Sequence, residues 1–247
     1  MTPRLTLVTA ARVLRQLRGD RRTVALLLVV PCVLIGLLAW VYDGGPVVDR
    51  VGPALLGVFP FVVMFLVTSV TTLRERTSGT LERLLTTRLG RGDLVGGYAL
   101  AFGAAAVVQA VLATAFAVLV CGVDVAGPVG LLVVVAVADA VLGAALGLLV
   151  SGFARTEFQA VQFLPAVVLP QFLLCGLLVP REQLPAVLHA VSDVLPLSYA
   201  VDAMTTIATR TTAQGAAGDA GRDLVVVLGF VVAALVLGSA TLRRRTP

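Results

Sequence analysis

Few residues of this sequence have side chains and spacings suited to catalysis. All 19 basic residues are arginines, which excludes Walker-A loops, Schiff bases and kinase sites that require a lysine. His189 is the only histidine, so a metal site built from several histidines is also excluded. Cys32, Cys121 and Cys175 lie in apolar stretches, where we expect them to pack as small apolar side chains without a disulfide framework.

Asp139 has the most unusual position, because no other charged residue occurs between 125 and 154. A carboxylate at the centre of a membrane helix costs about 2.5–3.5 kcal/mol and usually has a partner or a function. Gly143, Gly147 and Ser151 follow it at intervals of four residues. The four residues therefore share a helix face, and the two glycines allow another helix to approach closely. We expect Asp139 to face protein and not lipid.

Three roles for Asp139 are open at this stage: helix packing, contact with a cationic or polar substrate, and proton coupling. No arginine lies inside an apolar stretch, so the carboxyl group would be protonated or hydrogen-bonded, with Gln109 as a candidate partner. An intramembrane enzyme needs paired catalytic groups, and Asp139 stands alone. Gln162 and Gln171 lie close to prolines, whose freed carbonyls can be satisfied by polar side chains. We expect these glutamines to form hydrogen bonds with neighbouring helices.

The overall composition is that of an integral membrane protein. Of the residues, 58% are hydrophobic and 13% are charged, and the mean hydropathy is +1.00, whereas about 25% of an average soluble domain is charged. A helix needs about 20 apolar residues to cross the bilayer. We therefore expect an all-α fold that forms a single domain over 1–247. The six expected transmembrane helices are 23–42, 51–73, 96–122, 128–153, 159–179 and 223–242.

Arginine placement predicts the orientation of these helices. Fifteen arginines lie before the first span, between the second and third, between the fourth and fifth, and after the sixth, and four lie on the other side. By the positive-inside rule the side with 15 arginines is cytoplasmic. Both termini are then cytoplasmic, in a plasma or bacterial inner membrane. The net charge of +5 is explained by this topology and by anionic lipid headgroups, without a nucleic acid partner.

The first 22 residues are predicted to form an elbow helix on the membrane surface. One helix face carries apolar residues and the other carries arginines, which is the pattern of interfacial helices. The apolar residues are Leu7, Ala10, Leu14 and Leu17, and the basic ones are Arg4, Arg12 and Arg15, with Arg18 near the boundary. Gly19-Asp20 offers a break before the first span. The helix is either an anchor alone or also touches a cytoplasmic partner.

The connection between the second and third spans, 74–93, is charged. Ser78-Gly79-Thr80 can end one helix and cap a second. In that second helix Leu81, Leu84 and Leu85 share a face, while Glu82 and Arg83 point elsewhere. Such a helix is either a solvated loop or a segment that docks into a groove of another protein.

Three segments give the sequence a family resemblance: Arg74–Thr87, Leu148–Gln162 and Leu195–Ala203. Together they resemble the permeases of ABC-2-type exporters, including the daunorubicin/doxorubicin-resistance-like group. The resemblance implies an N-terminal elbow helix, six transmembrane helices and a cytoplasmic coupling helix between spans two and three. It also implies outer re-entrant or interfacial helices before span six.

A permease of this family is expected to be half of a transporter. The resemblance implies a dimer with a second copy or a homologous permease, and a separate ATPase subunit that binds ATP and magnesium. This chain itself would carry no cofactor and would not be an enzyme. The expected substrate is an amphipathic drug, an antibiotic or a lipid-like compound. A permease for a lipid-linked glycan and a structural or sensory membrane subunit are the alternatives.

The resemblance also implies roles for individual residues. The positions expected to dock on the ATPase, in or beside the coupling helix, are Glu75, Ser78, Gly79, Leu81, Glu82 and Arg83. The basic positions of the elbow helix are Arg12, Arg15 and Arg18. The positions expected to line the translocation path or to pack helices are Gln109, Asp139, Gln162 and Gln171.

Overall fold

The computed structural model describes residues 3–43, 45–78, 90–210 and 213–241. All regular structure in these ranges is helical. Six helices are long and apolar enough to cross a membrane, which confirms the expected all-α architecture with six spans. They are α2 (Arg21–Val41), α3 (Pro46–Thr77), α5 (Arg91–Leu119), α6 (Val129–Ser151), α7 (Glu157–Leu174) and α10 (Ala213–Thr241).

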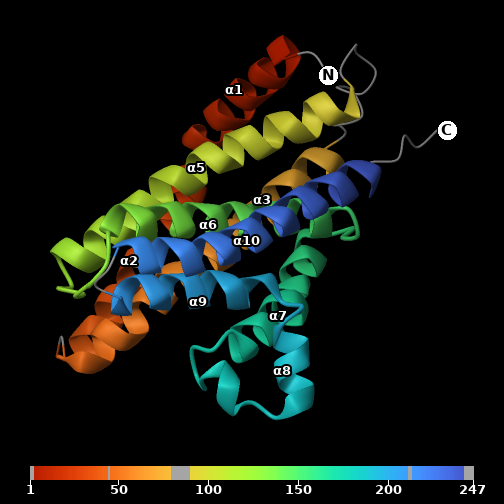
Figure 1. Ribbon diagram of the computed structural model, residues 1–247. Helices are drawn as coiled ribbons and strands as arrows, with labels where there is room; N and C mark the ends of the chain where they lie inside the picture. Colours follow the sequence, from red (N-terminus) through yellow and green to blue (C-terminus); the bar gives the residue numbers. More distant parts are fainter. Residues whose placement is uncertain (1–2, 44, 79–89, 211–212, 242–247) are drawn as a thin grey trace.

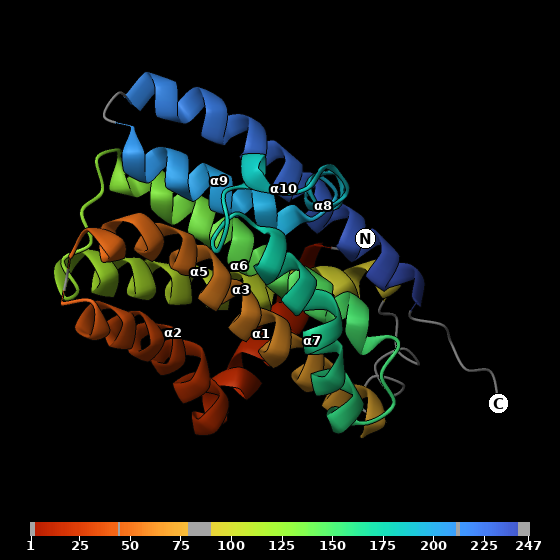
Figure 2. The same ribbon diagram turned by 90° about the horizontal axis from the view of Figure 1, so that it is seen from below.

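Four shorter elements complete the described chain. Helix α1 (Pro3–Gly19) precedes the spans and lies along the first part of α5 (Figure 1). Between α7 and α10 the chain forms the 3-10 helix η1 (Arg181–Gln183), then α8 (Ala186–Ser192) and α9 (Pro196–Thr209). Helix α9 packs along α10, α3 and α6 (Figure 2), whereas the segment containing α8 projects from the bundle beyond α7 (Figure 1).

The break between α1 and α2 lies at the predicted position. Helix α1 ends at Gly19, and the Asp20 carboxylate accepts hydrogen bonds from the backbone N–H groups of Arg22 at 3.1 Å and Thr23 at 3.2 Å. The Thr23 hydroxyl donates a third bond to Asp20 at 2.7 Å. These bonds from Thr23 and Arg22 lower the pKa of Asp20, because they favour the charged form. Asp20 therefore caps the start of the first span.

Helix α1 buries one of its faces against the protein. The described residues that α1 buries are Thr9, Ala10, Val13 and Leu17, whereas Leu7 is 61% exposed. Ala10 and Leu17 of the predicted apolar face pack on protein, and the placement of that face on the membrane stays a prediction. The helix is turned so that Thr9 meets Gly97 of α5, where an added Cβ would lie 2.6 Å from the Thr9 Cβ. Close contact with α5, not the amphipathic pattern alone, sets the rotation of α1.

Helices α3 and α6 share the most extensive contact among the described helices. A Cβ added at Gly143 would overlap the backbone carbonyl oxygen of Phe61, and one added at Gly147 would overlap that of Phe65. The glycine face of α6 therefore lies directly on the α3 backbone. This confirms the close packing that the glycine spacing predicted.

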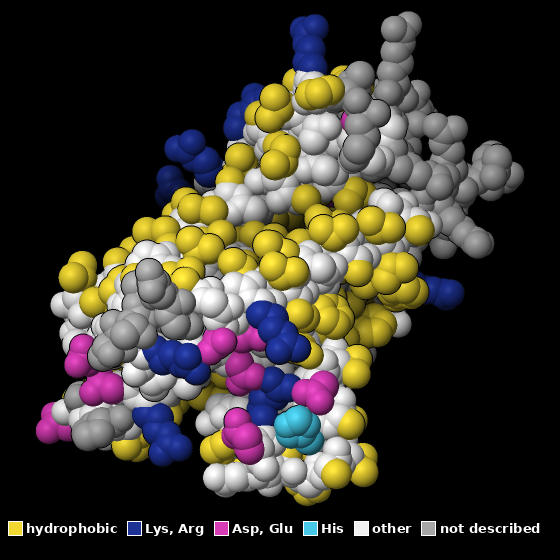
Figure 3. Space-filling model, in the orientation of Figure 1, with side chains coloured by type: hydrophobic (Ala, Val, Ile, Leu, Met, Phe, Trp, Pro, Cys, Tyr) yellow, Lys and Arg dark blue, Asp and Glu magenta, His cyan; other side chains and the backbone are white. Residues whose placement is uncertain are grey.

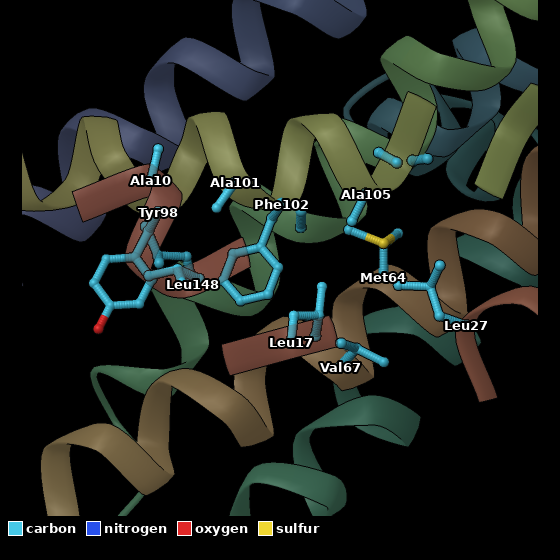
Figure 4. Close-up of a cluster of buried hydrophobic side chains, with 14 of the residues drawn as sticks. Ala10, Leu17, Leu27, Met64, Val67, Tyr98, Ala101, Phe102, Ala105 and Leu148 are labelled. Carbon is cyan, nitrogen blue, oxygen red and sulfur yellow. The ribbon is translucent and has the colours of Figure 1, made fainter. Parts of the chain in front are cut away.

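Apolar side chains from several helices fill the interior. Figure 4 shows one cluster in which Leu17 of α1 and Leu27 of α2 gather with Met64 of α3 and Phe102 of α5. Apolar side chains also cover much of the outer surface (Figure 3), particularly on α2, α5 and α10. An apolar exterior of this extent is expected where lipid chains replace water as the solvent.

The α3–α6 contact leads to a stability prediction. Replacing Gly143 with alanine places a methyl group against a backbone atom that cannot rotate away, so we expect a loss of about 1–3 kcal/mol. Gly229→Ala in α10 is the matched control, because nothing lies within 4 Å of a Cβ added there. The measurement is the melting temperature of the full-length protein in detergent. Equal melting temperatures for the two variants would contradict the packing account.

Candidate functional site

Three consecutive residues at the end of α3 contact five other helices. We call Arg74, Glu75 and Arg76 the α3 hub. Helix α3 ends at Thr77, and the part of the charged connection to α5 that follows it is residues 79–89. The hub therefore lies between that connection and the membrane helices. Each of its side chains reaches a different neighbour.

Arg74 links α3 to the start of α7 and to the start of α2. Its guanidinium donates two hydrogen bonds to the Glu157 carboxylate, from Nε at 2.8 Å and from an Nη at 2.9 Å. Asp20, the cap of α2, lies 3.9 Å from the same guanidinium. All three side chains are partly open to solvent. The ion pairs therefore orient the helix ends but add little to the free energy of unfolding. The two parallel bonds give the contact between the end of α3 and the start of α7 a defined geometry.

Glu75 is buried and links α3 to α1 and α5. Its carboxylate is 3% exposed and accepts hydrogen bonds from both Nη atoms of Arg12, at 2.9 and 3.3 Å. The Tyr98 hydroxyl of α5 also donates to this carboxylate. Burial lowers the pKa of Arg12, but its contacts with Glu75 and Tyr98 outweigh burial and raise that pKa overall. The Arg12 guanidinium therefore stays charged, and its bonds to Glu75 tie the elbow helix to the bundle.

Arg76 completes the hub by donating to the backbone carbonyl of Ser151, the last residue of α6. The carbonyls at a helix C-terminus lack partners within the helix and carry partial negative charge. The start of α5 is held separately, because the Thr6 hydroxyl of α1 donates to Asp93 at 3.3 Å. Both ends of the connection between α3 and α5 are thus attached to α1.

The structure separates the residues expected to dock on a partner. Glu75 faces α1 and α5 inside the protein, so its carboxylate is not offered to a partner. Ser78 is the C-cap of α3, and its hydroxyl donates to the Glu75 carbonyl at 3.2 Å. The other four expected docking positions lie outside the described residues: Gly79, Leu81, Glu82 and Arg83. Their role stays a prediction.

The elbow arginines also separate into two groups. Arg12 points inward, with its side chain 29% exposed. Arg15 and Arg18 are exposed, and the Arg15 Nε donates only locally, to the carbonyl of Ala11 at 3.2 Å. Exposed arginines at this position suit anionic headgroups.

Asp139 is fully buried, as expected, but the hydrogen bond to Gln109 is absent. Both Asp139 oxygens and both polar atoms of the Gln109 amide lack hydrogen-bond partners among the described residues. The carboxylate lies instead toward α3 and α9, where a Cβ added at Gly57 would be 3.3 Å from Asp139 Oδ2 and 3.0 Å from the sulfur of Met204. The expected bond fails because the glycine face of α6, which includes Asp139, is turned toward α3. Substrate contact and proton coupling stay predictions.

The two glutamines of α7 have different surroundings. Gln171 is buried; its amide donates to the Val167 carbonyl at 3.0 Å and accepts from the N–H of Leu197 at 3.4 Å. Gln171 therefore joins α7 to the start of α9, so of its two expected roles it has that of packing helices together. Gln162 is exposed on α7.

Several residues of the site were not identified from the sequence. Glu157 and Ser151 both lie in the segment Leu148–Gln162, and the family resemblance of that segment is the sequence signal that marks them. Tyr98 carries no comparable signal, because one tyrosine in an apolar helix has no distinctive spacing. Arg181 was counted only for topology, although it has several polar partners in the structure.

Comparison with known proteins assigns this architecture to a family. A family model described as ABC-2 type transporter matches residues 4–208. The chain belongs to the ABC-2 type transporter family. The matched range of this ABC-2 chain runs from α1 through α9 and contains the whole α3 hub.

Curated relatives agree with that family. The ABC-2 chain is 27% identical over 186 residues to a protein named probable multidrug ABC transporter permease YbhS of Escherichia coli, covering 75% of this chain and 48% of that one. It is 28% identical over 150 residues to the probable multidrug ABC transporter permease YbhR of the same species, covering 61% and 41%. ABC transporter G family member 20 of Dictyostelium discoideum is 28% identical over 157 residues, covering 64% and 22%. The aligned part is less than half of each of these relatives.

The Arg12–Glu75 pair leads to a prediction for the ABC-2 chain. Arg12→Gln leaves a buried carboxylate without its cation; because Arg12 is partly exposed, we expect a loss of about 2–3 kcal/mol, below the value for fully buried pairs. The matched control is Arg15→Gln, one turn along the same helix, which should be neutral. Thermal unfolding of the full-length protein measures both. Adding Glu75→Gln to Arg12→Gln should recover most of the loss, and failure to recover would contradict the pairing.

Proposed function

We propose that this chain is the transmembrane permease subunit of an ATP-driven ABC exporter. The observation that carries the proposal is the match to the ABC-2 family over residues 4–208, which includes the α3 hub. A separate ATPase subunit binds ATP and magnesium and docks on the connection between α3 and α5. A second permease, identical or homologous, completes the complex in a plasma or inner membrane.

The hub gives this proposal a physical route from the ATPase to the membrane. A force applied to residues 79–89 reaches α3 directly and reaches α7, α1 and α6 through Arg74, Glu75 and Arg76. The same force reaches α5 through the chain and through Tyr98. The connected helix ends then shift together as a rigid body, which is a common form of switching transition.

The charge distribution supports a cytoplasmic location for the hub and for both termini. Most arginines lie on the side of the membrane that carries α1 and the connection between α3 and α5, as the positive-inside rule requires. The exposed Arg15 and Arg18 of α1 then face the anionic headgroups of the inner leaflet. Membrane lipids are thus a further partner of the elbow helix.

The substrate class is an amphipathic drug, antibiotic or lipid-like compound. Two bacterial relatives carry multidrug permease names, and the bundle interior offers few charges to a ligand. Of the buried carboxylates among the described residues, Glu75 and Asp93 lie at helix ends, and Asp139 lies near the middle of a span. A highly polar substrate would find little compensation for its lost hydration in such an interior.

The proposal is tested by reversing one charge on the connection between α3 and α5. Glu82→Arg should reduce copurification of the partner ATPase and lower its stimulated ATP hydrolysis, because like charges then meet at the docking surface. The folding of the permease should be unchanged. Glu182→Arg, a reversal at an exposed position between α7 and α8, is the matched control and should copurify normally. Normal copurification and normal ATP hydrolysis with Glu82→Arg would contradict docking at this position. If no ATPase copurifies with the unaltered chain, the proposed function itself is contradicted.

A further inference from the structure

Arg181, in η1, is the centre of a second polar cluster. Its guanidinium side chain is only 12% exposed. It donates to the Ser192 hydroxyl at 2.8 Å and forms ion pairs with Asp193 and Asp202. The guanidinium carbon also lies 5.5 Å from the centre of the Tyr199 ring, a favourable arrangement for a cation over an aromatic face. One arginine thus joins α8 to α9.

Surrounding contacts hold these partners in place. The Ser192 hydroxyl lies 3.1 Å from the Ser198 hydroxyl and 2.9 Å from the Leu174 carbonyl, to which it donates. The Tyr199 hydroxyl donates to the Asp193 carbonyl at 2.7 Å. The end of α7, the end of α8 and the first turn of α9 therefore form one hydrogen-bonded unit around Arg181. Because several partners are buried, separating them would leave polar groups unpaired.

Local backbone geometry makes room for the guanidinium. Gly176 has a φ of +93°, which a residue with a Cβ rarely adopts. A Cβ at Gly176 would also lie 3.3 Å from the Arg181 Cγ. The turn after α7 is thus shaped to bring Arg181 back toward α9.

The partners of Arg181 account for one of the three segments that the sequence singled out. Ser198, Tyr199 and Asp202 all belong to Leu195–Ala203, and they lie at the start of α9 within little more than one helical turn. Burial raises the pKa of Asp202, and the charge of Arg181 partly opposes this effect. Loss of Arg181 would leave the half-buried Asp202 carboxylate without the positive charge that offsets its burial.

Helix α9 connects this cluster to the centre of the bundle. Met204, one turn beyond Tyr199, lies with Asp139 of α6 against Gly57 of α3. At its other end α7 is bonded to the α3 hub through Glu157. Helix α7 is therefore attached at its start to the hub and at its end, through Arg181, to the helix that covers Asp139.

We propose that Arg181 is a positioning residue for transport, which holds α9 rigidly to the end of α7 so that displacement of α7 moves α9 over Asp139. The structural half of the proposal stands on the Arg181 contacts alone. The half that concerns movement rests on the proposed function. The link stays closed during the cycle and acts as a rigid joint.

The structural half is tested by hydrogen–deuterium exchange of the full-length chain in lipid nanodiscs. Arg181→Gln should speed exchange in α8 and in the first turns of α9 by about tenfold, because local opening no longer breaks charged contacts. Exchange in α5 should not change, which separates this effect from general unfolding. Arg210→Gln is the matched control, because Arg210 forms an exposed pair with Asp219 at 2.8 Å. Unchanged exchange in Arg181→Gln would overturn the proposal.

An engineered disulfide between α8 and α9 tests whether the link stays closed during the cycle or must open. Ser192→Cys with Ser198→Cys, in a chain whose native cysteines are replaced by alanine, can be oxidised to join α8 to α9. In the complex with the ATPase, ATP should change the hydrogen–deuterium exchange of α9 in the unaltered chain. Arg181→Gln should abolish this ATP effect. The oxidised cysteine pair, added to Arg181→Gln, should restore the effect. An oxidised pair that abolishes the ATP effect in the otherwise unaltered chain would overturn the rigid joint. If ATP changes nothing in the unaltered chain, the proposed function fails, and the nanodisc experiment without ATP still decides the Arg181 link.

Discussion

The close approach of α3 and α6 is the contact on which the remaining arrangement depends. Lipid chains are as apolar as leucine, so membrane helices associate through fit more than through the hydrophobic effect. Gly143 and Gly147 place the backbone of α6 on the backbone of α3 at Phe61 and Phe65. This contact fixes the rotation of α6 and directs Asp139 toward α3 and α9. Helices α5, α9 and α10 then pack on the pair.

The ion pairs of this apolar bundle lie near helix ends and in the segment after α7. At one end of α3 the hub joins α1, α2, α5, α6 and α7 through Arg74, Glu75 and Arg76. After α7, Arg181 joins α8 and α9. The partly buried pairs of Glu75 and Arg181 lose much when broken, whereas the exposed pair of Arg74 and Glu157 contributes a defined geometry and little stability. They are therefore suited to keeping helices in register while the bundle moves.

The sequence predicted features that depend on composition and local spacing. Six spans follow from apolar stretches, the Gly19-Asp20 break from a capping residue, and the close approach of another helix to α6 from Gly143 and Gly147, although the partner helix, α3, was not predicted. It did not predict features that depend on how helices are rotated against each other. Arg12 and Glu75 are 63 positions apart, and their meeting depends on how α1 lies on α5. The missing Asp139–Gln109 bond has the same origin, because each helix offers several faces and tertiary contact selects one.

The central claim is that the α3 hub carries movement from the connection at 79–89 into the spans, and charge exchange at Arg74 and Glu157 tests it most directly. The measurement is the ATP-induced change in deuterium uptake of α7 in the complex with the ATPase. The account predicts that Arg74→Glu abolishes this change and that Arg74→Glu with Glu157→Arg restores it, since the pair is then re-formed with opposite polarity. A full ATP-induced change in the Arg74→Glu single variant would contradict the account.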